Sequence, residues 1–326
     1  MKATSSIEAG ERRDLTLQGG LRFDYRFLAV MTVIAVYGLI VLGGTVRATD
    51  SGTACPDWPL CHGRVVPPFE TKVMIEYAHR LVASAVGFMI LGTVIWGWRR
   101  HRQNRFVTRG GAAIIVLLAG QVILGGVTVK TETAASVVAL HLSMALTLFT
   151  LLIATAVTAF VLENGQRLPE IGGVRGLLRR VDMVPILAMA GTFALIILGA
   201  FVSQMGAGLV YPDWPLFDGK LVSAGGRLAD IHYAHRLLAA VAGLLILGFG
   251  WQLFQRDRRP VVMGALAVLG LLFGAQVMIG ALNVWLELAT SVRILHLALA
   301  SAVWGVLVFA VAYRLLIPQE RTGVAA

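Results

Sequence analysis

Four of the seven histidines fall within or beside long apolar runs. We expect each a few residues inside the outer end of an even-numbered membrane helix, so that all four share one level near one membrane surface. An ionisable side chain inside a membrane is costly and points to a function by default. One such histidine could equally be a packing residue, but four at matched places favour ligation. They are His79, His141, His235 and His296.

Two neutral imidazoles that face each other across a four-helix bundle are a common way to hold a haem iron. We therefore predict two pairs, His79 with His141 and His235 with His296. Structural packing is the main alternative. Zinc, copper or di-iron sites are a second alternative, but they usually recruit further carboxylates or thiolates. Glu76 precedes His79 as in a di-iron Glu-x-x-His pair, yet the second half of the chain does not repeat that pattern.

An arginine directly follows two of these histidines. As snorkelling residues, Arg80 and Arg236 would only mark a helix end. As planar guanidinium groups, they could pair with haem propionates in bidentate geometry. Their presence in both halves of the chain favours propionate pairing.

An internal repeat runs through the chain at offsets of 156 and 155 residues. A repeat with so small a change in offset predicts two tandem units of the same topology, related by an axis near the membrane normal. The matched segments are Cys-Pro-Asp-Trp-Pro-Leu (55–60) with Tyr-Pro-Asp-Trp-Pro-Leu (211–216), Tyr-Ala-His-Arg-Leu (77–81 and 233–237), and Gln-Val-Ile-Leu-Gly (121–125) with Gln-Val-Met-Ile-Gly (276–280).

The composition requires membrane helices to carry this repeat. The chain has 326 residues, of which 57% are hydrophobic and 14% charged. Its mean hydropathy is +0.77. Soluble domains carry nearer a quarter charged residues, so an ordinary soluble fold is excluded. The formal charge of +10 comes from basic residues between apolar runs, so we expect membrane lipid and no nucleic acid as a partner.

Eight uncharged runs are long enough to cross a bilayer as helices. We predict an all-α, polytopic membrane protein whose eight transmembrane helices form two tandem pseudo-symmetric four-helix bundles. The runs are Phe27–Val46, Leu81–Trp98, Gly110–Val129, Thr133–Leu162, Met183–Pro212, Leu237–Gln255, Pro260–Leu286 and Ile294–Tyr313.

Basic residues set the orientation. Nineteen of the 28 Lys and Arg residues lie on one side of the predicted helices, which is the cytoplasmic side by the positive-inside rule. Both termini are then cytoplasmic, and the long loops at about 47–75 and 213–231 lie outside. The predicted divisions are a tail (1–26), an N-terminal bundle (27–162), a cytoplasmic linker (163–182), a C-terminal bundle (183–316) and a second tail (317–326).

The two halves differ in their outer loops. Cys55 and Cys61 are the chain's two cysteines, and their counterparts are Tyr211 and Phe217. In an oxidising exterior, the cysteines are expected to form a disulfide that holds the first loop. A redox-active pair is the alternative.

A second difference sets Glu76 against His232. Glu76 and His79 are three residues apart and share a helix face, so the carboxylate should approach the first histidine pair. It could be a solvated helix-start residue that suits the helix dipole. It could instead act as a base or position a water, which would make the first bundle the site of chemistry. His232 could aid the second site or replace a ligand there.

Taken together, these features resemble the haem A synthase family. The resemblance rests on the eight spans, the Cys-Pro-Asp-Trp-Pro-Leu-Cys loop (55–61), Glu-Tyr-Ala-His-Arg (76–80) and the histidine repeat. It covers the chain from about residue 27 to 315. Such proteins oxidise a ring methyl group of haem O to a formyl group, by two hydroxylations and loss of water. The product, haem A, serves cytochrome oxidase assembly.

The resemblance also implies roles for single residues. The N-terminal bundle would bind haem O, and the C-terminal bundle would hold haem b as cofactor. Glu76 would be catalytic, and Cys55 and Cys61 would be the family's paired cysteines. The implied ligands are His79, His141 and Arg80 for the substrate haem, and His235, His296 and Arg236 for haem b.

Expected partners follow from the same resemblance: haem O synthase, cytochrome oxidase assembly proteins and an electron acceptor that the sequence does not identify. A homo-oligomer is a further expectation, and the expected location is a bacterial plasma (inner) membrane. Two rival functions use the same histidines. One is a di-haem b electron-transfer protein, and the other is a haem transfer chaperone.

Overall fold

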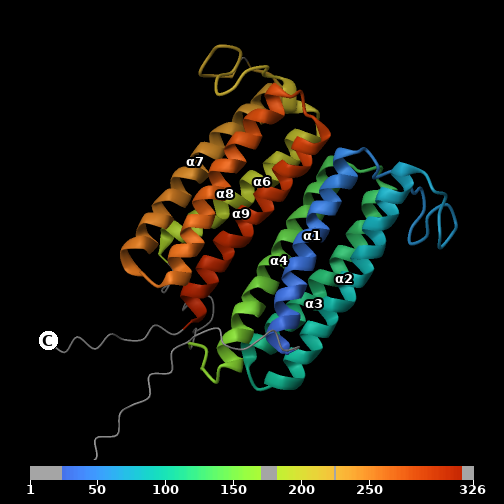
Figure 1. Ribbon diagram of the computed structural model, residues 1–326. Helices are drawn as coiled ribbons and strands as arrows, with labels where there is room; N and C mark the ends of the chain where they lie inside the picture. Colours follow the sequence, from blue (N-terminus) through green and yellow to red (C-terminus); the bar gives the residue numbers. More distant parts are fainter. Residues whose placement is uncertain (1–23, 170–181, 224, 318–326) are drawn as a thin grey trace, which may run out of the picture.

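A computed structural model describes residues 24–169, 182–223 and 225–317 (Figure 1). Predictions for most of the two tails, and for the linker at 170–181, lie outside these residues. Within the described part, every regular element is helical apart from two isolated β-bridges. The all-α prediction is confirmed.

Among the described residues, eight helices are long and apolar enough to cross a membrane, as predicted. A short 3₁₀ helix, η1, follows α6 at Ala207–Leu209. The long helices are α1 (Tyr25–Ala48), α2 (Thr71–His101), α3 (Arg105–Lys130), α4 (Ala135–Glu163), α6 (Met183–Gln204), α7 (Arg227–Arg256), α8 (Pro260–Trp285) and α9 (Thr290–Leu316).

Two helices begin earlier than their apolar runs. The predicted starts at Leu81 and Leu237 are ten residues too late, because α2 begins at Thr71 and α7 at Arg227. Both extensions contain charged residues, which ended the apolar pattern without ending the helix. Several of those charged side chains form hydrogen bonds with the long loop that precedes their helix, which compensates for their burial.

Local capping explains where other helices begin. The side chain of Asp24 accepts a hydrogen bond from the backbone N–H of Phe27 and caps α1. Asn104 caps α3 in the same way, accepting from the N–H of Phe106. Pro260 occupies the first turn of α8, where its missing N–H costs nothing.

The helices pack as two groups that lie side by side (Figure 1). In the N-terminal group, contacts run round a ring from α1 to α2, α3, α4 and back to α1; α6 to α9 form the C-terminal group in the same way. Contacts between the groups join α4 to α9, α1 to α9 and α4 to α6. We call this contact region the seam. The residue boundaries of the two predicted bundles stay a prediction.

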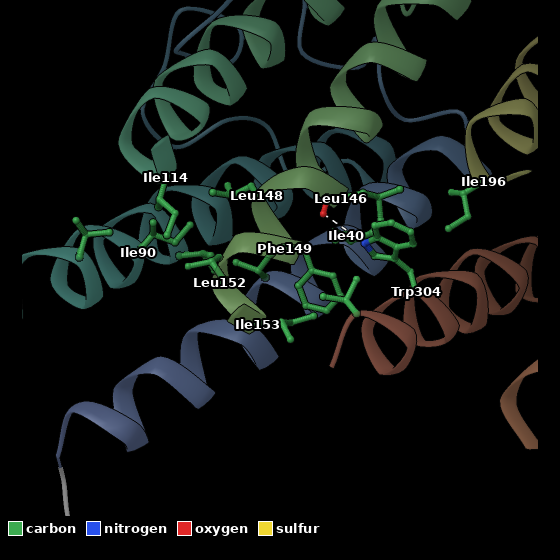
Figure 2. Close-up of a cluster of buried hydrophobic side chains, with 14 residues drawn as sticks. Ile40, Ile90, Ile114, Leu146, Leu148, Phe149, Leu152, Ile153, Ile196 and Trp304 are labelled. Atoms are coloured by element: carbon green, nitrogen blue, oxygen red, sulfur yellow. Dashed lines mark hydrogen bonds between the residues drawn. The ribbon is translucent and has the colours of Figure 1, made fainter. Parts of the chain in front are cut away.

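One hydrophobic cluster spans the seam. It contains buried side chains from both groups, with Leu146 and Phe149 of α4 near Trp304 of α9 (Figure 2). The indole Nε1 of Trp304 donates hydrogen bonds to the carbonyl of Leu146 at 3.4 Å and to Oγ1 of Thr150 at 3.1 Å. Apolar burial and a partnered indole therefore hold the two groups together.

Both long loops lie at one end of the molecule, and the described chain ends lie at the other (Figure 1). At the end opposite the loops, Asp182 forms ion pairs with Arg256 and Arg314. Glu163 there pairs with Arg100 and with His101. This arrangement agrees with an even number of spans in each half.

Candidate functional site

The four predicted ligands occupy matched places in their helices. His79 and His235 each lie eight residues after the start of α2 and α7, and His141 and His296 lie six residues after the start of α4 and α9. Because neighbours pair round a ring, the two histidine-bearing helices of a group lie on its diagonal. His79 lies within electrostatic range of His141, and His235 within range of His296. The structure thus brings each predicted pair together.

Each histidine ring packs against a glycine of a neighbouring helix. At Gly43, Gly199 and Gly280 a side chain would crowd the ring, so the missing Cβ allows the close approach, whereas at Gly125 the contact would be an ordinary one. The four pairs, with the distance from a built Cβ to Cε1 of the ring, are Gly43–His79 (3.2 Å), Gly125–His141 (3.7 Å), Gly199–His235 (3.0 Å) and Gly280–His296 (3.3 Å).

Polar atoms around these rings lack partners. Nδ1 of all four histidines is buried without a hydrogen bond, and so is Oε1 of Gln121 and of Gln276. Nε2 of His296 lies 3.4 Å from Nε2 of Gln276. Buried polar groups in proteins are nearly always satisfied, so an unpartnered Nδ1 on the matching histidines of both groups indicates a ligand rather than structural packing.

The donor set fits a haem iron. Among the described residues, no group of three or more His, Cys, Asp or Glu side chains is placed to hold a metal ion. A porphyrin supplies four ligands itself, so two imidazoles complete its iron. The diagonal pairs offer that number in each helix group.

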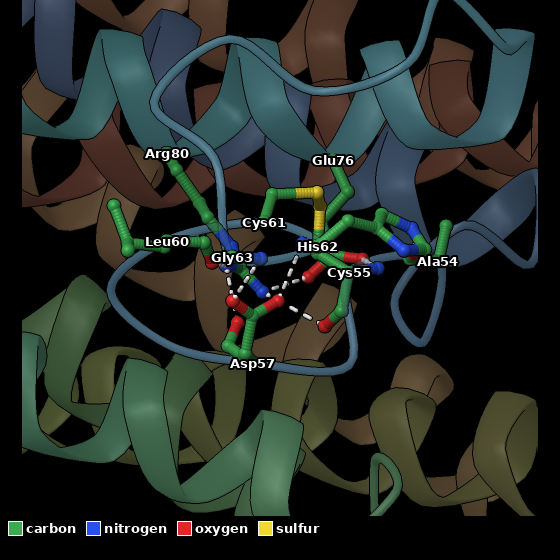
Figure 3. The surroundings of a disulfide bond; sticks show 9 residues. All are labelled: Ala54, Cys55, Asp57, Leu60, Cys61, His62, Gly63, Glu76 and Arg80. Carbon is green, nitrogen blue, oxygen red and sulfur yellow. Dashed lines mark hydrogen bonds and ion pairs between the residues drawn. A yellow bond between two sulfur atoms is a disulfide. The ribbon is translucent and has the colours of Figure 1, made fainter.

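The first outer loop closes over the start of α2 (Figure 3). Cys55 and Cys61 form the predicted disulfide, and both are buried. The carboxylate of Asp57 accepts hydrogen bonds from the backbone N–H of His62 at 2.6 Å and of Gly63 at 2.7 Å. These bonds close the turn in which His62 and Gly63 adopt positive φ.

Glu76 lies beneath this loop and is only 4% exposed (Figure 3). Its Oε2 accepts a hydrogen bond from the backbone N–H of Cys55 at 2.8 Å, and its Oε1 accepts one from Nη2 of Arg80 at 2.5 Å. The alternative of a solvated helix-start residue is therefore wrong. Both carboxylate oxygens are oriented by the loop and by α2.

Arg80 ties the loop to α2. Its Nη1 donates to the carbonyls of Asp57 at 2.7 Å and Leu60 at 2.6 Å, and its Nη2 also donates to the carbonyl of Cys55 at 3.2 Å. The predicted pairing of Arg80 with a haem propionate is not tested by these contacts. Both Nη groups of Arg80 therefore have hydrogen-bond partners within the protein.

The second outer loop has the same set of hydrogen bonds, in which an aspartate closes a turn and an arginine binds two loop carbonyls; we call this set the frame. The carboxylate of Asp213 accepts from the N–H of Asp218 at 2.7 Å and of Gly219 at 2.8 Å. Nη1 of Arg236 donates to the carbonyls of Asp213 at 2.9 Å and Leu216 at 2.8 Å. In both loops the turn amides lower the pKa of the aspartate, with the amide of Gly63 the largest cause for Asp57 and that of Gly219 for Asp213.

The frame holds different side chains in the second half. Tyr211 and Phe217 meet edge to face at 5.1 Å where the first loop has its disulfide. His232 replaces Glu76, is 5% exposed, and accepts a hydrogen bond from Nε of Arg236 at 3.1 Å. Nη2 of Arg236 is buried without a partner. Arg236 therefore keeps a free donor, whereas Nη2 of Arg80 already has partners.

Several residues of the site had no recognised role at the sequence level. Gly199 was missed, although its offset of 156 from Gly43 could have revealed it. Gln276 was seen only as part of the repeat, and its contact with His296 required the structure. Nothing in the local sequence indicates that Arg80 bonds to loop carbonyls some twenty residues away.

These features define a class: an integral membrane protein with an internal repeat and, in each half, a diagonal pair of half-buried histidines whose Nδ1 atoms are buried. The chain belongs to the COX15-CtaA family, described as cytochrome oxidase assembly protein, whose sequence model matches residues 26–72 and 68–308.

Individual relatives agree with this family. A protein named Heme A synthase from Symbiobacterium thermophilum is 30% identical over 303 residues, which cover 90% of this chain and 96% of the relative. One of the same name from Lysinibacillus sphaericus is 28% identical over 87% of this chain and 94% of its own length. A Thermus thermophilus protein named Protoheme IX farnesyltransferase is 29% identical over 82% of this chain but only 45% of its own length.

Proposed function

We propose that this chain is a haem A synthase, an oxidoreductase that converts a ring methyl group of haem O to a formyl group. Its family and the names of its relatives support this function. The structural observation that carries the proposal is a pair of half-buried histidines, each with a buried Nδ1 that lacks a partner, which recurs at matched places in both helix groups. Two such pairs suit one substrate haem and one resident haem.

The two helix groups divide the work in this proposal. His79 and His141 bind the iron of haem O, and His235 and His296 bind a resident haem b. The difference between Glu76 and His232 supports this division, because in the part of the chain that the structure describes only the N-terminal site has a buried carboxylate beside its histidines. Arg236 suits the resident haem, since its buried Nη2 is free to donate to a propionate. Haem b supplies one-electron transfer when bound.

Glu76 is the proposed catalytic residue. It lies one helical turn from His79, on the same face of α2, so its carboxylate can reach groups at the edge of a haem bound there. Its role is to accept a proton from water or a hydroxyl group during the oxidation. The Cys55 amide and Arg80 orient the two oxygens, which fixes the geometry of that transfer.

The setting of the enzyme is part of the proposal. The macrocycle and farnesyl tail of haem O are apolar and suit a membrane bundle. The end of the molecule at which most basic residues lie faces the cytoplasm of a bacterial cell. Haem O synthase is the expected supplier of substrate. The Thermus thermophilus relative supports this link, since a protein named for farnesyl transfer to protohaem aligns with this chain over part of its length. The oxidation also requires an electron acceptor, and the product haem passes to cytochrome oxidase assembly proteins.

Extraction of haems from the purified protein tests the function. We expect haem b together with smaller amounts of haem O or haem A, identified by chromatography and mass. A Glu76→Gln control should keep haem b and contain haem O without haem A. A single haem type in both proteins would instead indicate a di-haem electron-transfer protein. Release of haem O unchanged by the wild type would indicate a haem transfer chaperone.

A further inference from the structure

Two arginines from different helix groups meet at the outer end of the seam. Arg47 lies in the last turn of α1, and Arg293 lies in the first turn of α9. Nη2 of Arg47 reaches the carbonyl of Ser203 in α6 at 3.4 Å, and Nη1 of Arg293 donates to the carbonyl of Ala48 at 3.1 Å. The two guanidinium groups lie within electrostatic range of each other.

Their positive charge is under-compensated. Among the described residues, Asp50 is the one carboxylate paired with Arg47, at 3.0 Å, and its side chain is 68% exposed. No ion pair joins Arg293 to a described carboxylate within 4.0 Å. Nε of Arg47 is buried without a partner. Two like charges near a membrane interior repel each other, so an anion bound between them would lower the energy of the pair.

The pair lies just outside both candidate haem sites. Gly43, which packs against the ring of His79, precedes Arg47 by one helical turn. His296 follows Arg293 by three residues, which is also about one turn. An anion at the arginine pair would therefore lie on the outer side of both candidate sites, close to the seam.

Because the arginine pair lies beside the candidate haem sites, a haem propionate is the anion that fits this location. The charge of Arg80, the arginine beside His79, is already paired with the buried carboxylate of Glu76, whereas Arg47 has an exposed carboxylate partner and an Nε without a partner, and Arg293 has no ion pair with a described carboxylate. We propose that Arg47, assisted by Arg293, binds a propionate carboxylate of haem O in the N-terminal site. The proposal rests on the function proposed above. A lipid phosphate could use the same donors, and the experiment separates the two sources.

Equilibrium binding tests the proposal without measuring catalysis. Protein is produced in a host without haem O and titrated with haem O or with its dimethyl ester, which has no propionate charge. The wild type should bind the acid more tightly than the ester. Arg47→Gln should weaken binding of the acid by about tenfold, since it removes a hydrogen bond to a charged group, and should leave the ester almost unaffected. Arg293→Gln should show a smaller loss of the same kind.

Two variants serve as controls. Lys130→Gln removes a positive charge at the outer end of α3, away from the seam, and should preserve the wild-type preference for the acid. Arg47→Lys keeps the charge and should restore part of the preference. The haem b spectrum of each variant reports whether the protein is folded. If Arg47→Gln does not fold, the Arg293→Gln and Arg47→Lys titrations carry the test.

The contrary outcomes are distinct. An unchanged preference for the acid in Arg47→Gln or in Arg293→Gln overturns the proposal. Loss of a bound phospholipid from Arg47→Gln, measured as phosphorus per protein, with an unchanged preference assigns the site to lipid phosphate. A wild type that keeps haem b but binds neither haem O nor its ester contradicts the proposed function itself.

Discussion

The two outer loops share a frame and differ in what the frame holds. In each, an aspartate closes a turn through two backbone amides, and an arginine of the following helix bonds to two loop carbonyls. The first frame holds a disulfide and a buried glutamate, whereas the second holds an aromatic pair and a histidine. The shared bonds are therefore structural, and the chemistry that distinguishes the halves lies in the exchanged side chains.

Removal of the histidine ligands should have the largest effect. His235→Ala or His296→Ala should lose haem b completely, because each removes one of the two imidazoles that would hold its iron. His79→Ala or His141→Ala should keep haem b and lose haem O binding. Reduced-minus-oxidised spectra and haem extraction measure both. A haem b spectrum that survives His235→Ala would reverse or abolish the assigned division between the halves.

Substitution of Glu76 should lower activity almost as much as loss of a histidine does, but it should leave the haem content unchanged. Glu76→Ala should lower haem A formation by about 10²- to 10⁴-fold, as expected for loss of a general base. Glu76→His, which copies the second half, should be equally inactive with its loop still closed. Haem A per haem b is the quantity to measure. Normal haem A yield from either variant would remove Glu76 from the mechanism.

Alanine at the four glycines should give a graded series. Gly199→Ala should disturb its histidine most, since the new Cβ would lie 3.0 Å from His235, and Gly125→Ala least, with 3.7 Å to His141. Overpacking of this kind costs roughly 1–3 kcal/mol. At the proposed haem b site, the haem b spectrum should be shifted or weakened more in Gly199→Ala than in Gly280→Ala, whose new Cβ would lie 3.3 Å from His296. Equal spectra would show that the rings have room to move.

A loop exchange separates the two interpretations of the disulfide. Cys55→Ser should loosen the first loop by roughly 2 kcal/mol and lower activity, with haem b retained. The double change Cys55→Tyr with Cys61→Phe copies the aromatic pair of the second loop. If the disulfide is structural, the double variant should be more protease-resistant and more active than Cys55→Ser. A closed loop without activity would favour a redox role instead.

Acid should open both loops to a small extent and only at low pH. The pKa of Asp57 and of Asp213 is lowered in the folded loops, so their contribution to loop stability is complete above the ordinary value of 3.8 and is lost as the pH falls through the lowered value. The protection factors of the turn amides, corrected for the pH dependence of intrinsic exchange, should be unchanged between neutral pH and 3.8. Opening of the loops at a pH above 3.8 would mean that another titrating group controls them.

Much of the fold could be predicted because the membrane leaves few choices. Uncharged runs of sufficient length must become helices, and the repeat fixed which helices correspond. The starts of α2 and α7 could not be predicted in this way. Residues such as Lys72 and Arg227 ended the apolar signal, while the backbone remained helical.

The candidate site was predictable where residues recur and unpredictable where contacts are distant. The four histidines and Glu76 stood out by their spacing and by the difference between the halves. The bond from the Cys55 amide to Glu76 depends on the path of the loop, which no sequence period records. The meeting of Arg47 with Arg293 likewise arises only when the helix groups pack together.

The seam has a consequence for the origin of the chain. By the repeat, α4 corresponds to α9 and α1 to α6, so the contact of α1 with α9 is the equivalent of the contact of α6 with α4. An interface that maps onto itself in this way is isologous, which is the geometry of a twofold homodimer. A half-length ancestor paired with its own copy would have had two identical sites, and fusion of the copies would have freed each to specialise.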